Sequence, residues 1–179
     1  MSGERSASAI VWLTGLPGSG KSTIARALEA SLRARRVGVC VLDGDELRRG
    51  LCRDLGFSPR DRSENLRRAG EVAAILAALD LVVVAAFVSP DRRDRLMTRA
   101  LAGPFPFVEV FVDCPVSECA RRDPKGLYRR ARAGEIMEFT GVSSPYETPE
   151  APDIHLLTDR CSVADSVETI LRHLGYRGS

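Results

Sequence analysis

The sequence has no apolar run long enough to cross a bilayer as a helix. Its longest apolar run, Leu81–Val88, has the length of a strand, whereas a membrane-spanning helix needs about 20 residues. The first eight residues are polar and lack the apolar centre of a signal peptide. We therefore expect a cytoplasmic protein with no membrane partner.

The five cysteines include no C-x-x-C pair. An odd number of scattered cysteines argues against both a disulfide framework and a zinc site. Because a free cysteine is among the most buried residue types, we expect reduced thiols that are mostly packed. The positions are Cys40, Cys52, Cys114, Cys119 and Cys161.

The chain also lacks a large net charge, an internal repeat and a flexible linker. Its 26 basic and 24 acidic residues leave a formal charge of +2, which argues against a nucleic-acid partner. Local arginine-rich stretches suit small anions better. With 179 residues, 44% of them hydrophobic, the chain has the size of one domain. We expect a single domain over residues 1–179, with an ordered core at 9–175.

What the sequence does contain is an alternation of short apolar strands and amphipathic helices. The predicted strands are Ile10–Thr14, Val37–Leu42, Leu81–Phe87, Phe107–Val112 and Ile154–Leu157. The predicted helices are Ser22–Ala34, Arg62–Leu79 and Val163–Leu174. This alternation is typical of an α/β fold with a parallel sheet and helices on both faces. In such sheets ligands bind beyond the carboxyl ends of the strands.

The first strand runs directly into a segment, residues 15–22, that matches G-x-x-x-x-G-K-[ST]. In a P-loop of this kind the backbone N–H groups enclose phosphates, and the next helix directs its positive end at them. Lys21 would reach the β- and γ-phosphate oxygens, and Ser22 would ligate Mg²⁺. The motif predicts a three-layer fold of the P-loop NTPase type. The predicted ATP-binding residues are Gly15, Leu16, Pro17, Gly18, Ser19, Gly20, Lys21, Ser22 and Thr23.

A P-loop alone does not distinguish a GTPase switch, a motor ATPase and a small-molecule kinase. The guanine-reading motif N-K-x-D is absent, which argues against a switch. The third strand ends in Val88-Ser89-Pro90, without an aspartate to hold the metal. Asp43, at the end of the second strand, is therefore the expected metal-holding carboxylate beside Ser22.

A small-molecule kinase also needs a mobile cover that keeps water away from the transferred phosphoryl group. Residues 122–141 are rich in cations and bounded by glycine and proline, which favours such a lid. We expect it to be mobile in the free protein, with few apolar residues to hold it down. The competing interpretation is a solvated basic helix face.

Several segments, in order along the chain, make the sequence similar to the adenylylsulfate kinases. They lie at residues 42–48, 54–58, 62–65, 86–90, 122–128, 131–136 and 139–141. The similarity extends roughly over residues 10–158 and includes segments that other P-loop kinases lack. These enzymes use MgATP to phosphorylate the ribose 3′-hydroxyl of adenosine 5′-phosphosulfate (APS), which gives 3′-phosphoadenylyl sulfate. The resemblance implies the same activity here.

The resemblance also implies roles for the matching residues. Phe57 and Phe139 would enclose the adenine of APS, although such phenylalanines are more often core residues. Lys21 and Asp43 would be catalytic. Ser89 matches a serine described in the family as a phosphorylated intermediate, a step that direct in-line transfer does not need. The implied acceptor-binding residues are Asp45, Arg48, Phe57, Arg62, Asn65, Val88, Ser89, Lys125, Gly126, Leu127 and Phe139.

Two alternatives stay open at this point. One is a P-loop phosphotransferase with another small acceptor, such as a nucleoside monophosphate or a sugar acid. The other is a non-catalytic partner of a sulfate-activating complex, against which the intact Lys21, Ser22, Asp43 and Asp45 argue. We expect a homodimer, and we expect any ATP sulfurylase partner to be a separate protein.

Overall fold

The chain forms a sheet of five parallel strands in the order β2-β3-β1-β4-β5. The structure is a computed structural model that describes residues 8–176. The strands are β1 (Ala9–Thr14), β2 (Val39–Asp43), β3 (Val82–Ala86), β4 (Phe107–Asp113) and β5 (Ile154–Leu157). All five predicted strands are present, with small shifts at their ends.

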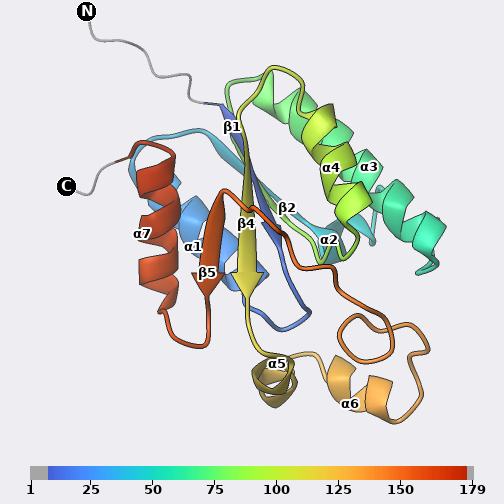
Figure 1. Ribbon diagram of the computed structural model, residues 1–179. Coiled ribbons are helices and arrows are strands. Elements are labelled where there is room, and N and C mark those ends of the chain that lie inside the picture. The colour runs from blue at the N-terminus through green and yellow to red at the C-terminus, as the bar shows by residue number, and fades with distance from the viewer. Residues whose placement is uncertain (1–7, 177–179) are drawn as a thin grey trace, which may run out of the picture.

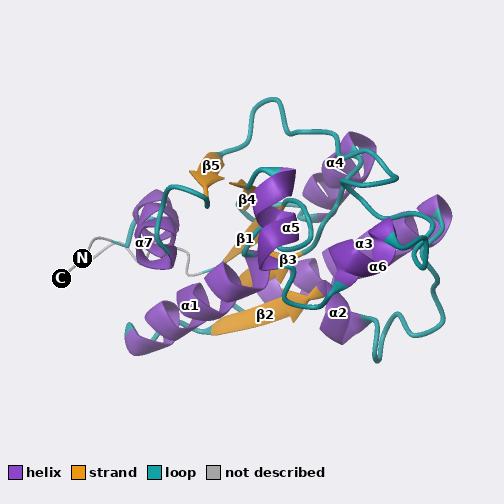
Figure 2. Ribbon diagram, turned by 90° about the horizontal axis from the view of Figure 1, so that it is seen from below, coloured by secondary structure: helices purple, strands orange, loops and turns teal. Residues whose placement is uncertain are grey.

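Helices cover both faces of the sheet, so the predicted three-layer α/β fold is confirmed (Figure 1). One face carries α1 (Lys21–Ala34) and α7 (Val163–His173), and the other carries α3 (Pro59–Ala77) and α4 (Arg92–Leu101). Three short helices, α2 (Gly44–Leu47), α5 (Val116–Arg122) and α6 (Leu127–Arg132), follow the carboxyl ends of β2 and β4. Figure 2, which views the molecule from that end, shows α5 in front of the central strands.

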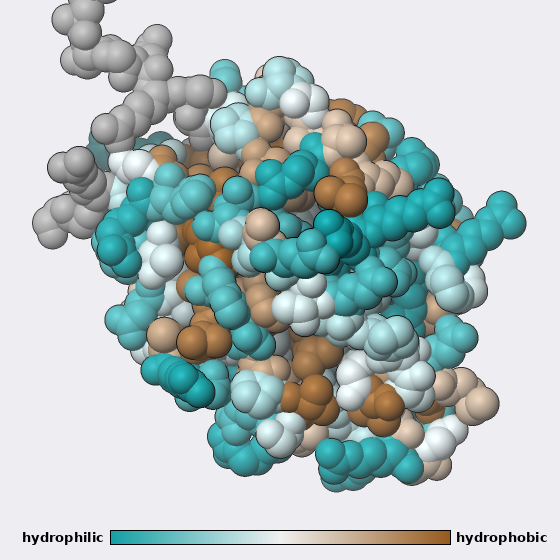
Figure 3. Space-filling view, viewed as in Figure 1, coloured by the Kyte–Doolittle hydropathy of each residue, from teal (hydrophilic) through white to brown (hydrophobic). Residues whose placement is uncertain are grey.

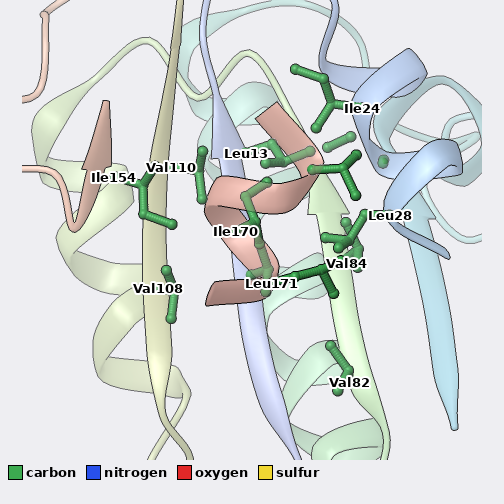
Figure 4. Packing of buried hydrophobic residues seen from close by; sticks show 14 of the residues in the cluster. Leu13, Ile24, Leu28, Val82, Val84, Val108, Val110, Ile154, Ile170 and Leu171 are labelled. Atoms are coloured by element: carbon green, nitrogen blue, oxygen red, sulfur yellow. The ribbon is translucent and has the colours of Figure 1, made fainter. Parts of the chain in front are cut away.

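Alternation along each strand divides the core into two layers, because successive side chains point to opposite faces. In β1, Val11 and Leu13 pack toward α1 and α7, whereas Ile10 and Trp12 pack toward α3 and α4. Figure 4 shows the first layer, in which Leu28 of α1 and Ile170 of α7 meet the valines of the sheet. All six of these side chains are at most 1% exposed. Burial on this scale contributes about 1.5–3 kcal/mol for each large aliphatic side chain.

Four helices, α2, α4, α5 and α6, were not predicted, and α3 begins three residues earlier than expected. Helix α3 starts at Pro59 and not at Arg62, because the Ser58 hydroxyl accepts the Asp61 N–H as an N-cap and proline suits the first turn. Helices α2 and α5 are only 4 and 7 residues long. Helix α4 has no apolar stripe, since its buried positions are Asp94, Arg95 and Thr98.

Between residues 8 and 176, none of the helices combines the length and the apolar character that crossing a membrane requires. Hydrophilic residues dominate the face seen in Figure 3, with apolar residues in small groups among them. All five cysteines are free thiols. Cys52, Cys114 and Cys119 are buried, whereas Cys161 is exposed.

Candidate active site

The predicted functional segments meet at one edge of the sheet. The strand register pairs Ala86 of β3 with both Leu13 of β1 and Asp43 of β2. The P-loop, the 43–45 segment and the 88–90 turn therefore leave the sheet at the same level. This is the expected position for a ligand site in a parallel sheet.

The P-loop bends tightly around the end of β1. A Cβ at Gly15 would lie 2.4 Å from the Val112 carbonyl oxygen, so only glycine fits there. Gly20, at φ 104°, precedes α1 and offers no side-chain cap to its first N–H groups. Those donors and the positive end of the helix are the features that bind a phosphate. Thr23 lies exposed on the first turn of α1.

The Lys21 side chain folds back onto the P-loop. Its ammonium donates hydrogen bonds to the carbonyls of Gly15 at 2.9 Å and Leu16 at 2.7 Å, and the residue is only 8% exposed. Burial lowers the pKa of Lys21 to about 8, and the carboxylates of Asp43 and Asp45 oppose this shift in part. A bound phosphate group would give the buried Lys21 ammonium a negatively charged partner.

This pKa predicts how nucleotide binding depends on pH. In the free protein Lys21 loses its proton as the pH rises through about 8, while a bound phosphate favours the charged form and raises the pKa. We therefore expect the affinity for MgADP to be constant below pH 8 and to fall above it, with proton uptake on binding. Calorimetry at pH 8.5–9 in buffers of different ionisation enthalpy measures that uptake. The Lys21→Met variant should show none, and equal uptake in both proteins would contradict the assignment.

Ser22 and Asp43 meet beside the P-loop. The Ser22 hydroxyl donates to Asp43 Oδ2 at 2.6 Å, and Asp43 Oδ1 accepts the N–H of Asp45 at 2.9 Å. A hydroxyl and a carboxylate are hard oxygen ligands that fit Mg²⁺. Within residues 8–176 no three acidic, histidine or cysteine side chains gather into a metal-binding group. The pair therefore fits an ion that takes most of its ligands from phosphates and water.

Arg62 connects two segments that are far apart in the sequence. Its Nε donates to the Phe57 carbonyl at 2.8 Å, and its terminal nitrogens donate to Thr140 Oγ1 at 2.9 Å and to the Glu138 carbonyl. The first acceptor belongs to Phe57, and the other two belong to the neighbours of Phe139. Phe57 and Phe139 are the two aromatic residues implied for adenine binding. Hydrogen bonds from the Arg62 guanidinium thus hold the Phe57 and Phe139 segments together.

One turn further along α3, Asn65 is 4% exposed, and its Oδ1 has no hydrogen-bond partner within residues 8–176. A buried polar atom without a partner is rare and calls for an explanation. Arg62 and Asn65 are three residues apart and lie on one face of the helix. The two residues therefore share one side of α3, and the unpaired Asn65 Oδ1 is suited to accept a hydrogen bond from a ligand.

The two phenylalanines have different environments. Phe57 is 64% exposed, with the Arg48 guanidinium 4.4 Å from its ring centroid. Phe139 is 7% exposed and meets the edge of Tyr128 at a centroid distance of 5.0 Å. Phe139 is thus a core residue in this structure, whereas the ring of Phe57 is exposed and can contact a ligand. Arg48 also donates to the Gly56 carbonyl at 2.8 Å.

The lid segment, residues 122–141, lies over the P-loop side of the site. Lys125 forms an ion pair with Asp45, both more than half exposed, and this contact joins the lid to α2. Gly126, at φ 67°, precedes α6, and Leu127 begins that helix.

The expectation of few apolar contacts in the lid is wrong. Tyr128 and Phe139 form a cluster with Cys114 and Cys119, and Leu16 of the P-loop packs against it. The Tyr128 hydroxyl also donates to the Pro17 carbonyl at 2.9 Å. These contacting residues are far apart in the sequence, so no local pattern predicts the cluster. The mobility of the lid stays a prediction.

Limited proteolysis tests that prediction. Lys125, Arg129, Arg130 and Arg132 are exposed, so trypsin can cut wherever the lid opens. We expect fast cleavage in the free protein and at least about tenfold slower cleavage with ADP plus APS, because ligand contacts shift the population toward the closed state. The Tyr128→Phe variant, which lacks the bond to the Pro17 carbonyl, should be cut faster without ligands. Equal rates with and without ligands would favour the rigid basic face.

Ser89 is buried at the end of β3. It is 2% exposed, donates to Thr14 Oγ1 at 2.8 Å and accepts the Trp12 indole N–H at 3.2 Å. Its φ of 37° is unusual for a residue with a side chain. The neighbouring Val88 carbonyl accepts the Thr14 hydroxyl at 2.9 Å. In this arrangement the Ser89 hydroxyl is used within the protein, and its role as a phosphorylated intermediate remains untested.

Two residues near the site were not among those predicted. Thr14 links β1 to the 88–90 turn and also contacts the Tyr146 hydroxyl at 2.9 Å. Burial raises the pKa of Tyr146 to about 12. Thr14 directly precedes the P-loop, a local signal that could have included it. Tyr146 comes from a loop 132 residues away along the chain, and only the fold places it there.

A family model described as adenylylsulphate kinase matches residues 7–157. The chain belongs to the adenylylsulfate kinase family. It is 57% identical over 148 residues to the adenylyl-sulfate kinase of Citrobacter koseri, covering 83% of this chain and 74% of that one. It is 55% identical over 167 residues to the bifunctional enzyme NodQ of Rhizobium tropici, covering 92% of this chain but only 26% of NodQ.

Among solved structures, this adenylylsulfate kinase family member is similar to the Mycobacterium tuberculosis APS kinase CysC in complex with AMPPNP and APS. The TM-score is 0.91 at 47% identity, and the match covers 94% of this chain and 98% of the other. The resemblance inferred from the sequence is thereby confirmed for the family and the fold.

Proposed function

We propose that this protein transfers the γ-phosphoryl group of ATP to the 3′-hydroxyl of APS and so produces 3′-phosphoadenylyl sulfate. The main observation behind this proposal is that Arg62 forms hydrogen bonds to both the Phe57 and the Phe139 segments. Beside it lies the unpaired amide oxygen of Asn65. Aromatic faces and a buried polar atom are suited to a purine nucleoside acceptor. The solved relative that holds AMPPNP and APS supports the same choice.

In the proposed reaction the bond between the γ-phosphorus and its bridging oxygen breaks, and a bond to the acceptor 3′-oxygen forms. The proton of the acceptor hydroxyl leaves to Asp43 or Asp45. Lys21 neutralises charge on the transferred group, as its position in the P-loop predicts. Ser22 and Asp43 would hold Mg²⁺, which supplies further positive charge at the phosphates when bound.

The acceptor would be held by groups on four segments: the end of α2, helix α3, the 88–90 turn and the lid. Arg48 and Arg62 suit its anionic phosphosulfate, since guanidinium forks match planar anionic oxygens. In this structure Arg62 donates to protein acceptors, so it would exchange some of these bonds for the ligand. Lys125 would likewise leave Asp45 for a substrate anion when both nucleotides are present. The backbone at Val88 and the segment 125–127 would complete the enclosure.

Product analysis tests the proposal. The protein is incubated with MgATP and one of three acceptors: APS, AMP or gluconate. We expect 3′-phosphoadenylyl sulfate with APS and at least about a hundredfold less phosphoryl transfer to the other two. Preferred transfer to AMP or gluconate would identify a different small-molecule kinase. ATP binding without transfer to any of the three would favour a non-catalytic nucleotide-binding partner.

We also propose that residues 1–179 act as one cytoplasmic kinase domain with a lid at 122–141 and small molecules as its ligands. A homodimer is supported by the exposed apolar side chains Ile75 of α3, Leu79 just after that helix and Leu96 of α4, because exposed apolar groups favour burial between subunits. Sedimentation of the purified protein tests it.

A further inference from the structure

Helix α4 buries a charged residue against the sheet. Arg95 is 4% exposed, and its Nε lies 3.1 Å from Oε1 of Glu109, a residue of β4 whose side chain is 14% exposed. A buried guanidinium costs several kcal/mol unless its charge and its donors are all satisfied. The partners of the other Arg95 N–H groups therefore indicate what this residue does in the helix.

Those donors converge on the turn that follows β3. One terminal nitrogen donates to the carbonyls of Ser89 at 2.9 Å and Pro90 at 3.1 Å, and the other donates to the Glu147 carbonyl at 2.7 Å. The guanidinium also lies 5.7 Å from the Tyr146 ring centroid. One side chain thus joins α4, β4, the 88–90 turn and the loop that leads to β5.

The turn needs such support because its backbone is strained. Ser89, at φ 37°, is in a backbone region that is unfavourable for a residue with a side chain. On its hydroxyl side, Trp12 and Thr14 hold the serine. On its carbonyl side, Arg95 holds both Ser89 and Pro90. Strain of this kind persists only where the surroundings determine the conformation from several sides.

We propose that Arg95, with Glu109 as its counter-ion, is a positioning residue that holds the Val88-Ser89-Pro90 turn in the shape that accepts the second substrate. This inference rests on the proposed function, in which the backbone at Val88 lines the acceptor site. A lysine cannot replace the arginine here, because its single ammonium lacks the planar fork that reaches Glu109 and several carbonyls together.

Arg95→Lys tests the proposal, with Arg93→Lys as the matched control. Arg93 is an exposed arginine on the same helix. For Arg95→Lys we expect the KM for APS to rise at least about tenfold, while the KM for MgATP stays within about twofold. For Arg93→Lys all kinetic constants should stay within about twofold. A purely structural role would change both KM values together or lower the amount of folded enzyme.

A second measurement is independent of activity. Trp12 is the single tryptophan of the chain, is fully buried and donates to the Ser89 hydroxyl, so its fluorescence reports on the turn. We expect a shifted emission maximum in Arg95→Lys and an unchanged one in Arg93→Lys. If Arg95→Lys does not fold, Glu109→Gln provides the test, because it keeps the side-chain shape and removes the counter-charge. For Glu109→Gln we then expect a smaller rise in the KM for APS, with the KM for MgATP again within about twofold.

The outcomes separate this proposal from the proposed function. If the wild-type protein does not phosphorylate APS, the proposed function fails, whereas the Trp12 emission still shows whether Arg95 shapes the turn. If the wild type is active and the folded Arg95→Lys or Glu109→Gln variant has an unchanged KM for APS, the positioning role is overturned. An equal rise in both KM values also overturns it.

Discussion

Replacing Lys21 by alanine is expected to lower kcat by on the order of 10²–10³ and to leave the fold intact. Removal of one preorganised donor to developing charge typically has an effect of this size. Among the described residues 8–176, the Lys21 ammonium donates hydrogen bonds only to P-loop oxygens. Its loss therefore removes charge from the phosphate site without opening the core. Steady-state kinetics and thermal unfolding measure the two parts of this prediction.

Arg33→Ala is the control for the Lys21 variant. Arg33 lies near the opposite end of the same helix and pairs with Glu29 on the surface. Exposed pairs of this kind contribute little to stability, so both kcat and the melting temperature should stay close to the wild-type values. A Lys21→Ala protein with normal melting behaviour and near-normal kcat would contradict the assignment of the P-loop lysine.

Replacing Arg62 by alanine is expected to weaken APS binding by about 2–3 kcal/mol, the scale of a hydrogen bond to a charged group plus the unpaired partner left behind. This corresponds to an affinity loss of roughly 30- to 150-fold. The affinity for MgATP should barely change, because Arg62 lies on α3, away from the P-loop. The structure adds a second reason for the loss, since Arg62 also holds the backbone at Phe57 and around Phe139.

Calorimetric titration of each nucleotide into the Arg62→Ala protein measures the difference. Arg60→Ala is the matched control, because Arg60 is an exposed arginine on the first turn of the same helix. Its APS affinity should stay within about twofold of the wild type. A loss of equal size for APS and MgATP in Arg62→Ala would show that α3 does not serve the acceptor.

Much of the fold was predictable, because its signals are local. A strand that runs into G-x-x-x-x-G-K-S and then a helix predicts the phosphate site from the sequence itself, since the motif encodes a backbone shape. The alternation of strands and helices predicted the parallel sheet, and the predicted bounds of β5 agree with the structure. Helix α3 was misplaced at its start, where the capping signal of Ser58 and Pro59 precedes the apolar pattern.

The sequence also determined the family, through short segments whose order and spacing are specific. It predicted Asp43 as a site residue from its position at the end of a strand, and Arg62 and Asn65 through the family resemblance. It did not show which partners these side chains have. That Arg62 joins the Phe57 and Phe139 segments depends on contacts across 76–78 residues, and such contacts leave no local pattern.

Only the tertiary structure decided how the charged and aromatic residues divide between surface and interior. Helix α4 was not predicted, and this arginine-rich helix buries Arg95 against Glu109 and the 88–90 turn. Phe139 is buried beside Tyr128, while Phe57 stays exposed. Composition cannot make this distinction. Burial of a charge depends on a partner from another strand, and burial of an aromatic ring depends on neighbours that only folding brings together.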